Sequence, residues 1–95
     1  MSPTATATAT AAVTVRVKYF ASIREALGLG QEEVSTMAPT LDALRTELIA
    51  RGGAYAEALD PARAVRMALN QALSEGTAVL APGAEVAFFP PVTGG

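Results

Sequence analysis

Hydrophobic and polar residues alternate from position 13 to position 20, the pattern of a strand with one buried face. The inner face would carry Val13, Val15, Val17 and Tyr19, and the outer face Thr14, Arg16, Lys18 and Phe20. A second, weaker strand is predicted over 32–36, next to the first. Because Glu32 and Glu33 are adjacent, they would point to opposite faces of that strand, so we do not interpret them as a catalytic acid/base pair.

Two kinds of helix signal accompany these strands, one between them and one after them. Ser22 and Glu25 have the spacing of a capping box, which predicts a short helix that stops near Gly28. The main helix is predicted after Thr40, which offers an N-cap, because leucine and isoleucine recur at helical spacing up to Gly52-Gly53. A further helical stretch over 54–59 would end at the turn-forming pair Asp60-Pro61.

The last third of the chain is expected to form strands. Alternation over 65–69, the turn candidate Asn70-Gln71 and the following Ala72-Leu73 predict a hairpin, and 85–89 predicts a final strand after a turn at Pro82-Gly83. The predicted fold class is α+β, a small mixed sheet with a helix across one face, which is the β-grasp (ubiquitin-like) architecture. We expect a disordered leader over 1–12, a domain over 13–89 and an extended tail over 90–95.

Composition narrows the possible functions. With 95 residues and a net charge of −2, the chain suits one domain, and it lacks the basic patch that nucleic acid requires. It has no cysteine and no histidine, which removes the usual metal ligands, nucleophile and general base. We therefore expect no bound metal or cofactor and no catalysis by this chain alone. The Thr/Ala leader does not resemble a signal peptide and no apolar run could span a bilayer, so we expect a cytoplasmic protein without a membrane partner.

The C-terminal tail is the best candidate for chemistry. Pro90 and Pro91 would end the last strand and stiffen the base of a tail that reaches about 20 Å when extended. Gly94 and Gly95 lack Cβ, so a partner could close around the backbone and reach the terminal carboxylate. Attack of that carboxylate on the α-phosphate of ATP would give an acyl-adenylate, and sulfide could then convert it into a thiocarboxylate.

An apolar patch is predicted beside the base of the tail. Strand parity places Phe20 and Phe89 on the outer face, and Leu73 could join them, whereas the short helix or a loop could instead cover one phenylalanine. Arg24, Arg63 and Arg66 could each recognise an acidic partner, although solvated surface charge is the commoner explanation.

Together these residues resemble the small subunit family of molybdopterin synthase, the MoaD-like branch of the ubiquitin-like sulfur carriers that also includes ThiS-like thiamine proteins. The resemblance covers roughly 13–95. Its most specific part is the run from Glu85 to Gly95, EVAFFPPVTGG, supported by Tyr19-Phe20-Ala21, Arg24-Glu25, the start of the helix after Thr40, and Asn70-Gln71. The Thr/Ala leader lies outside it.

The resemblance implies that Gly95 is adenylated by an ATP-consuming partner enzyme, receives sulfur from a sulfurtransferase donor, and passes it to a cyclic pyranopterin precursor. The active site would lie on a large synthase subunit, commonly in a heterotetramer. The tail residues Val92 and Thr93, with Pro90 and Pro91, would enter that subunit, and the family's patch maps onto Phe20, Leu73 and Phe89. The rival hypotheses are a thiamine-type carrier, a protein modifier that forms isopeptide bonds through Gly95, and an interaction domain with an inert tail.

Overall fold

The computed structural model describes residues 12–91, which form a five-stranded mixed sheet and three helices. The leader predicted over 1–12 therefore lies almost wholly outside the described residues. Within them, the elements in chain order are β1 (Val13–Tyr19), α2 (Ala21–Leu27), β2 (Gln31–Thr36), α3 (Leu41–Ile49), α4 (Gly53–Ala58), β3 (Arg66–Leu69), β4 (Ala72–Ser74) and β5 (Glu85–Phe89).

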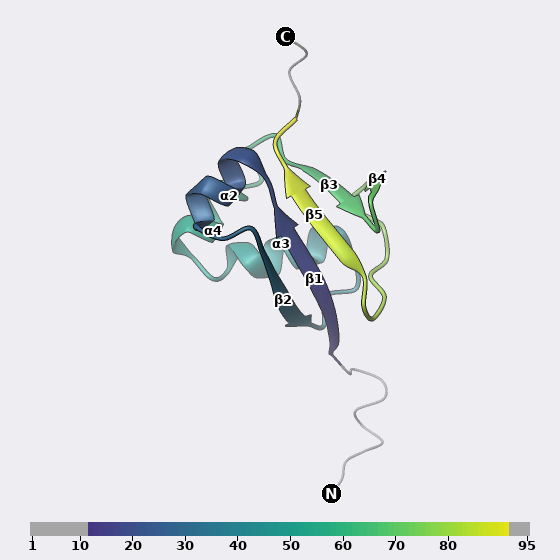
Figure 1. The fold of residues 1–95 in the computed structure, drawn as a ribbon. Helices are drawn as coiled ribbons and strands as arrows, with labels where there is room; N and C mark the ends of the chain where they lie inside the picture. Colours follow the sequence, from purple (N-terminus) through teal and green to yellow (C-terminus); the bar gives the residue numbers. More distant parts are fainter. Residues whose placement is uncertain (1–11, 92–95) are drawn as a thin grey trace, which may run out of the picture.

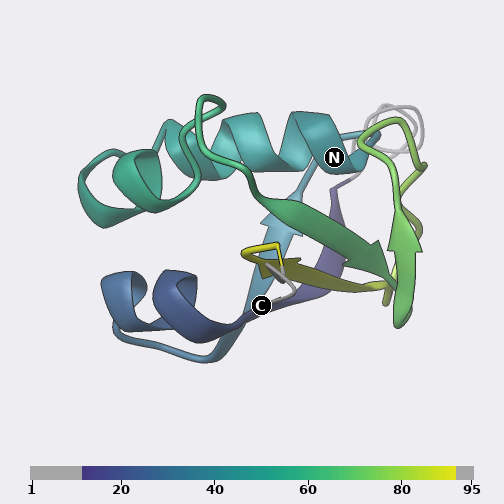
Figure 2. The ribbon, with the colours of Figure 1, turned by 90° about the horizontal axis from the view of Figure 1, so that it is seen from above.

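The strands lie in the order β2-β1-β5-β3-β4 (Figure 1). β5, the last strand in the sequence, occupies the centre, parallel to β1 and antiparallel to β3. β2 pairs with β1, as predicted, and the two strands run antiparallel. Seen from above, α3 lies across one side of the sheet and leaves the other side open (Figure 2). This arrangement confirms the α+β, β-grasp prediction.

The core lies between α3 and the inner face of the sheet. Thr40 caps α3 as predicted, since its Oγ1 accepts a 3.2 Å hydrogen bond from the Ala43 amide. The helix presents Leu41, Leu44 and Leu48, all fully buried, and each contributes roughly 1.5–3 kcal/mol by leaving water. They pack with Val15, Val17, Tyr19, Val86 and Phe88, which confirms the predicted inner stripes of the first and last strands.

The capping-box prediction for Ser22 was wrong. The N-cap position of α2 is Phe20, two residues before Ser22, so the helix begins at Ala21 and no side chain caps it. The reason is sheet pairing: the Phe20 amide donates to the Phe88 carbonyl at 3.2 Å, so β1 runs directly into the helix and carries Ser22 into its first turn. The predicted stop at Gly28 is confirmed, with φ +77° and an amide bonded to the Arg24 carbonyl.

No helix among residues 12–91 is long and apolar enough to cross a membrane.

The predicted hairpin is present, with Asn70 and Gln71 both at positive φ (52° and 71°). Two positive φ values in a two-residue connection are typical of a type I′ turn, whose twist matches that of the strands. The turn is fastened to β5, because the Asn70 side-chain oxygen accepts from the Glu85 amide at 3.0 Å.

Candidate functional site

β5 brings the chain to one end of the sheet, where the predicted tail begins. The strand ends at Phe89, and Pro90 and Pro91 cannot continue it because proline has no amide hydrogen to donate. This end of the molecule, Phe89 to Pro91, is called the tail root below. The remaining predicted site residues, Val92, Thr93, Gly94 and Gly95, lie outside the described residues.

A groove lies on the outer face of the sheet beside the tail root. Phe20, Leu73 and Phe89 all line it, as does Pro90. Phe20 is 45% exposed and Leu73 61%, which is unusual for side chains of this size. The groove has a volume of about 760 Å³ and is completed mainly by Ala68, Ala87, Pro91, Gln71 and Glu85. Phe20 is exposed and Phe89 is half-buried, and both side chains line the groove.

Backbone geometry explains how these side chains meet. Phe20 keeps extended backbone angles at the end of β1 and so continues the outer-face parity of that strand. The chain then turns sharply at Ala21, whose φ of +51° lies in the left-handed region that non-glycine residues rarely adopt. On the far side of β5, the type I′ turn returns Leu73 opposite Ala68. β5 lies between β1 and the β3–β4 hairpin and supplies Phe89.

Two ion pairs also lie on the outer face. Lys18 Nζ lies 3.5 Å from the carboxylate of Glu85, at the edge of the groove. Further from the tail root, Arg16 lies 3.7 Å from Glu33. On the outer face of the described residues, the apolar groove thus lies beside the tail root, with one ion pair at its edge and one further away.

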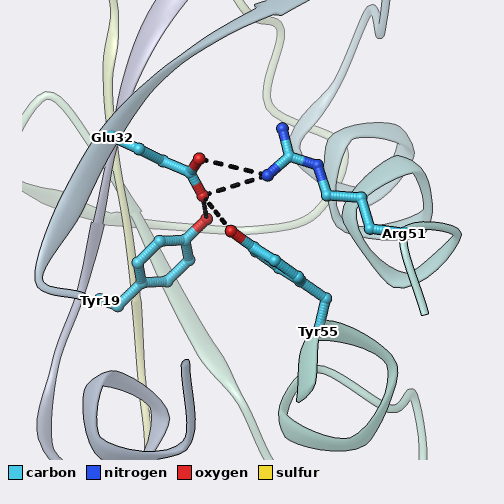
Figure 3. A network of polar contacts seen from close by, with 4 residues as sticks. All are labelled: Tyr19, Glu32, Arg51 and Tyr55. Carbon is cyan, nitrogen blue, oxygen red and sulfur yellow. Dashed lines mark hydrogen bonds and ion pairs between the residues drawn. The ribbon is translucent and has the colours of Figure 1, made fainter. Parts of the chain in front are cut away.

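A hydrogen-bond network lies on the opposite, inner side of the sheet (Figure 3). The hydroxyls of Tyr19 and Tyr55 each donate to the same oxygen of Glu32 at 2.7 Å. Arg51 donates to both oxygens of that carboxylate at 3.2 Å and lies 4.9 Å from the centre of the Tyr55 ring. The network joins β1 and β2 to Arg51, which lies between α3 and α4, and to Tyr55 in α4.

The network changes the pKa values of its members. Burial raises the pKa of Tyr19, and its bond to the Glu32 carboxylate raises it further. Burial alone would also raise the pKa of Glu32, but the hydrogen bonds from Tyr19, Tyr55 and Arg51 outweigh it, so the net effect lowers that pKa. Glu32 is thus held ionised as a structural acceptor.

Sequence reasoning missed this network. It placed Glu32 and Glu33 on opposite faces, which the register confirms, but it assigned Glu32 no partner. One signal was available: Tyr19 belongs to the buried stripe, and a buried tyrosine hydroxyl needs a hydrogen-bond partner. Tyr19 also stacks on Phe88, with ring centres 6.2 Å apart and an interplanar angle of 14°, so the network supports the strand that leads to the tail root.

Among residues 12–91, no three potential metal ligands of the His, Cys, Asp and Glu types come together. The features of the described part that lie near the tail root are the apolar groove and the hydrogen-bond network. The arrangement defines a small β-grasp domain whose last strand, at the centre of the sheet, leads to the C-terminus beside an apolar groove.

Comparisons with known proteins agree with this class. A family model described as the ThiS family matches residues 17–95. The molybdopterin synthase sulfur carrier subunit of Escherichia coli (strain K12) is 42% identical over 81 residues, covering 85% of this chain and 99% of that protein. The chain belongs to the ThiS family.

Solved structures extend the comparison. A putative molybdopterin converting factor subunit 1 from Pyrococcus furiosus superposes with a TM-score of 0.70 at 28% identity, over 84% of this chain and 99% of that one. A chain from the complex of subunits 1 and 2 of the molybdopterin-converting factor from Helicobacter pylori gives a TM-score of 0.58 at 27% identity, over 87% and 100% of the two chains.

Proposed function

We propose that this chain is the sulfur carrier subunit of a molybdopterin synthase. The observation that carries the proposal is its 42% identity, over nearly the full length of the relative, to a protein of that name. The chain ends in Gly94-Gly95, four residues beyond the tail root and its groove. A carrier of this kind needs a slender reactive end and a separate surface by which partners hold it, and the Gly-Gly sequence and the apolar groove fit these two needs.

The proposed chemistry takes place at the Gly95 carboxylate. An ATP-dependent adenylating enzyme joins one carboxylate oxygen to the α-phosphate of ATP, and pyrophosphate leaves. Sulfide from a sulfurtransferase donor then attacks the acyl carbon and AMP leaves, so that sulfur replaces an oxygen as a thiocarboxylate. Because the chain contains no cysteine, the terminal carboxyl group is the position on which it can carry sulfur covalently. ATP is consumed by the partner enzyme, and the carrier itself binds no cofactor.

The second half of the proposal concerns a large synthase subunit. The outer-face groove binds this subunit through Phe20, Leu73 and Phe89, while the residues from Pro90 to Gly95 enter its active site. There the thiocarboxylate passes its sulfur to cyclic pyranopterin monophosphate. The carrier is thus a co-substrate and the large subunit supplies catalysis, in a heterotetramer of two small and two large chains. The named subunit 1 and 2 complex from Helicobacter pylori supports a partner of this type.

The first experiment is intact-mass spectrometry of the untagged chain after incubation with ATP, the adenylating enzyme and a sulfur donor. Wild type is expected to gain the mass of sulfur replacing one oxygen at its C-terminus, whereas a variant lacking Gly95 gains none. Addition of the large subunit and the pterin precursor should then return the chain to its starting mass. A wild-type chain that never gains sulfur, but forms tail-dependent isopeptide adducts in cells, would favour the protein-modifier hypothesis instead.

A further inference from the structure

The six arginines of the chain divide into two groups. Arg16 and Arg51 form ion pairs with Glu33 and Glu32, and Arg45 donates to backbone carbonyls. Among residues 12–91, the side chains of Arg24, Arg63 and Arg66 form neither an ion pair nor a hydrogen bond with another described residue. Within the described part of the chain, these are the three cationic side chains without an internal partner.

Two of the three lie on either side of the tail root. Arg66 is the register partner of Phe89 at the start of β3 and shares its outer face, next to the groove. Figure 1 shows β3 beginning beside the end of β5. Arg63 lines a separate cleft of about 220 Å³, together with Ser22, Ile23 and Pro90. Both arginines are exposed.

The loop that carries Arg63 is rigidly supported. Arg45 reaches across from α3 and donates to the carbonyls of Leu59 (2.8 Å), Asp60 (2.7 Å) and Arg63 (3.2 Å). The Arg63 amide donates to the Asp60 carbonyl at 2.8 Å, and the Ala62 amide to the Asp60 carboxylate at 2.8 Å. Because the backbone at Arg63 is held in this way, the loop itself loses less ordering entropy when a partner binds the side chain.

We propose that Arg63 and Arg66 form a cationic pair that recognises acidic side chains of the large subunit around the entry of the tail, an inference that rests on the proposed function. The chain as a whole is acidic, with a net charge of −2. Charges of the opposite sign beside the tail root therefore orient the carrier toward a carboxylate-bearing surface. The only acidic side chain lining the Arg63 cleft is Glu57, which forms no ion pair with another described residue. In this proposal the apolar groove provides the contact area, and the two arginines orient the carrier on the large subunit.

The test measures association of the full chain with the large subunit of the same organism by stopped-flow, at low and high salt. The double variant Arg63→Gln/Arg66→Gln is expected to associate about three- to tenfold more slowly at low salt and to lose much of the salt dependence. Arg63→Lys/Arg66→Lys, which keeps the charge, should retain most of the rate. Arg16→Gln is the matched control, because it removes one charge from the outer face far from the tail root, where Arg16 is paired with Glu33.

The outcomes separate this inference from the function on which it rests. If wild type does not bind the large subunit at all, the proposed function fails. If wild type binds, but the double glutamine variant associates at the same rate and with the same salt dependence as Arg16→Gln, only the arginine proposal is overturned. A defect confined to adenylation, with normal association to the large subunit, would also overturn it, because the arginines would then serve a nucleotide or the adenylating enzyme. Thermal melting of each variant verifies that it is folded.

Discussion

The hydroxyl of Tyr19 donates a 2.7 Å hydrogen bond to Glu32 across the β1–β2 pair, while the residue that follows each of them in the chain points the opposite way. Phe20 lines the groove, and Glu33 pairs with Arg16 in solvent. Neighbouring residues thus belong to opposite faces of the sheet, one to the hydrogen-bond network and the next to the outer face. The two sides can be tested independently by substitutions at neighbouring positions.

Glu32→Gln is expected to destabilise the fold by about 1–3 kcal/mol, because three donors lose a charged acceptor. Glu33→Gln is the matched control: its ion pair with Arg16 is 3.7 Å long and mostly exposed, so its loss should cost less than about 1 kcal/mol. Urea denaturation followed by circular dichroism measures both. Equal midpoints for the two variants would show that the network contributes nothing beyond surface charge.

The same carboxylate predicts how stability depends on pH. The folded-state pKa of Glu32 lies below its ordinary value of 4.5, so its contribution is fully present above pH 4.5 and is lost as pH falls through the lower folded-state pKa. The stability gap between wild type and Glu32→Gln should therefore close in acid. For Tyr19 the sign is opposite: its raised pKa gives stability that is present below pH 10.0 and is lost as pH rises above it. Urea midpoints measured across pH check both limbs, and a gap that stays constant in acid would contradict the first.

Leu73→Asp is expected to weaken binding of the large subunit at least about tenfold, because it places a charge in the apolar groove. Leu73 is 61% exposed, so the fold should be retained. Val79→Asp provides the comparison, since Val79 is 71% exposed and does not line the groove. Titration calorimetry with the large subunit measures both affinities. If the two variants bound equally well, the groove would not be the contact surface.

Gly28→Ala should cost about 1 kcal/mol or more, because Gly28 ends α2 at φ +77°, where a Cβ is strained even though the space around it is open. Gly30→Ala makes a useful control. Gly30 has no left-handed φ, and an added Cβ would meet only the Arg24 side chain, at 3.4 Å. Thermal denaturation should rank wild type and Gly30→Ala together and Gly28→Ala clearly below them. Failure of that order would mean that the backbone at Gly28 relaxes.

Local patterns were sufficient for most of the fold. Four predictions rested on signals that span only a few residues, and all four were confirmed: the alternation over 13–19, the alternation over 85–89, the cap at Thr40 and the leucine spacing after it. The capping-box prediction at Ser22 is based on an equally local signal, but it was wrong because a hydrogen bond between distant parts of the chain overrides that signal. The Phe20 amide pairs with Phe88, and this pairing sets where α2 begins.

The sequence by itself determined the strand faces, the main helix, the turn at Asn70-Gln71 and a chain that ends in two glycines, because these depend on neighbours along the chain. Only the tertiary structure decided which elements meet. Placing β5 between β1 and β3 brings Phe20, Leu73 and Phe89 into one groove and sets Arg66 beside Phe89. Folding α4 against α2 and the edge of the sheet brings Tyr55 to Glu32 across 23 positions. Such contacts depend on how the whole core packs, so they cannot be predicted from the pattern of hydrophobic residues within a single helix or strand.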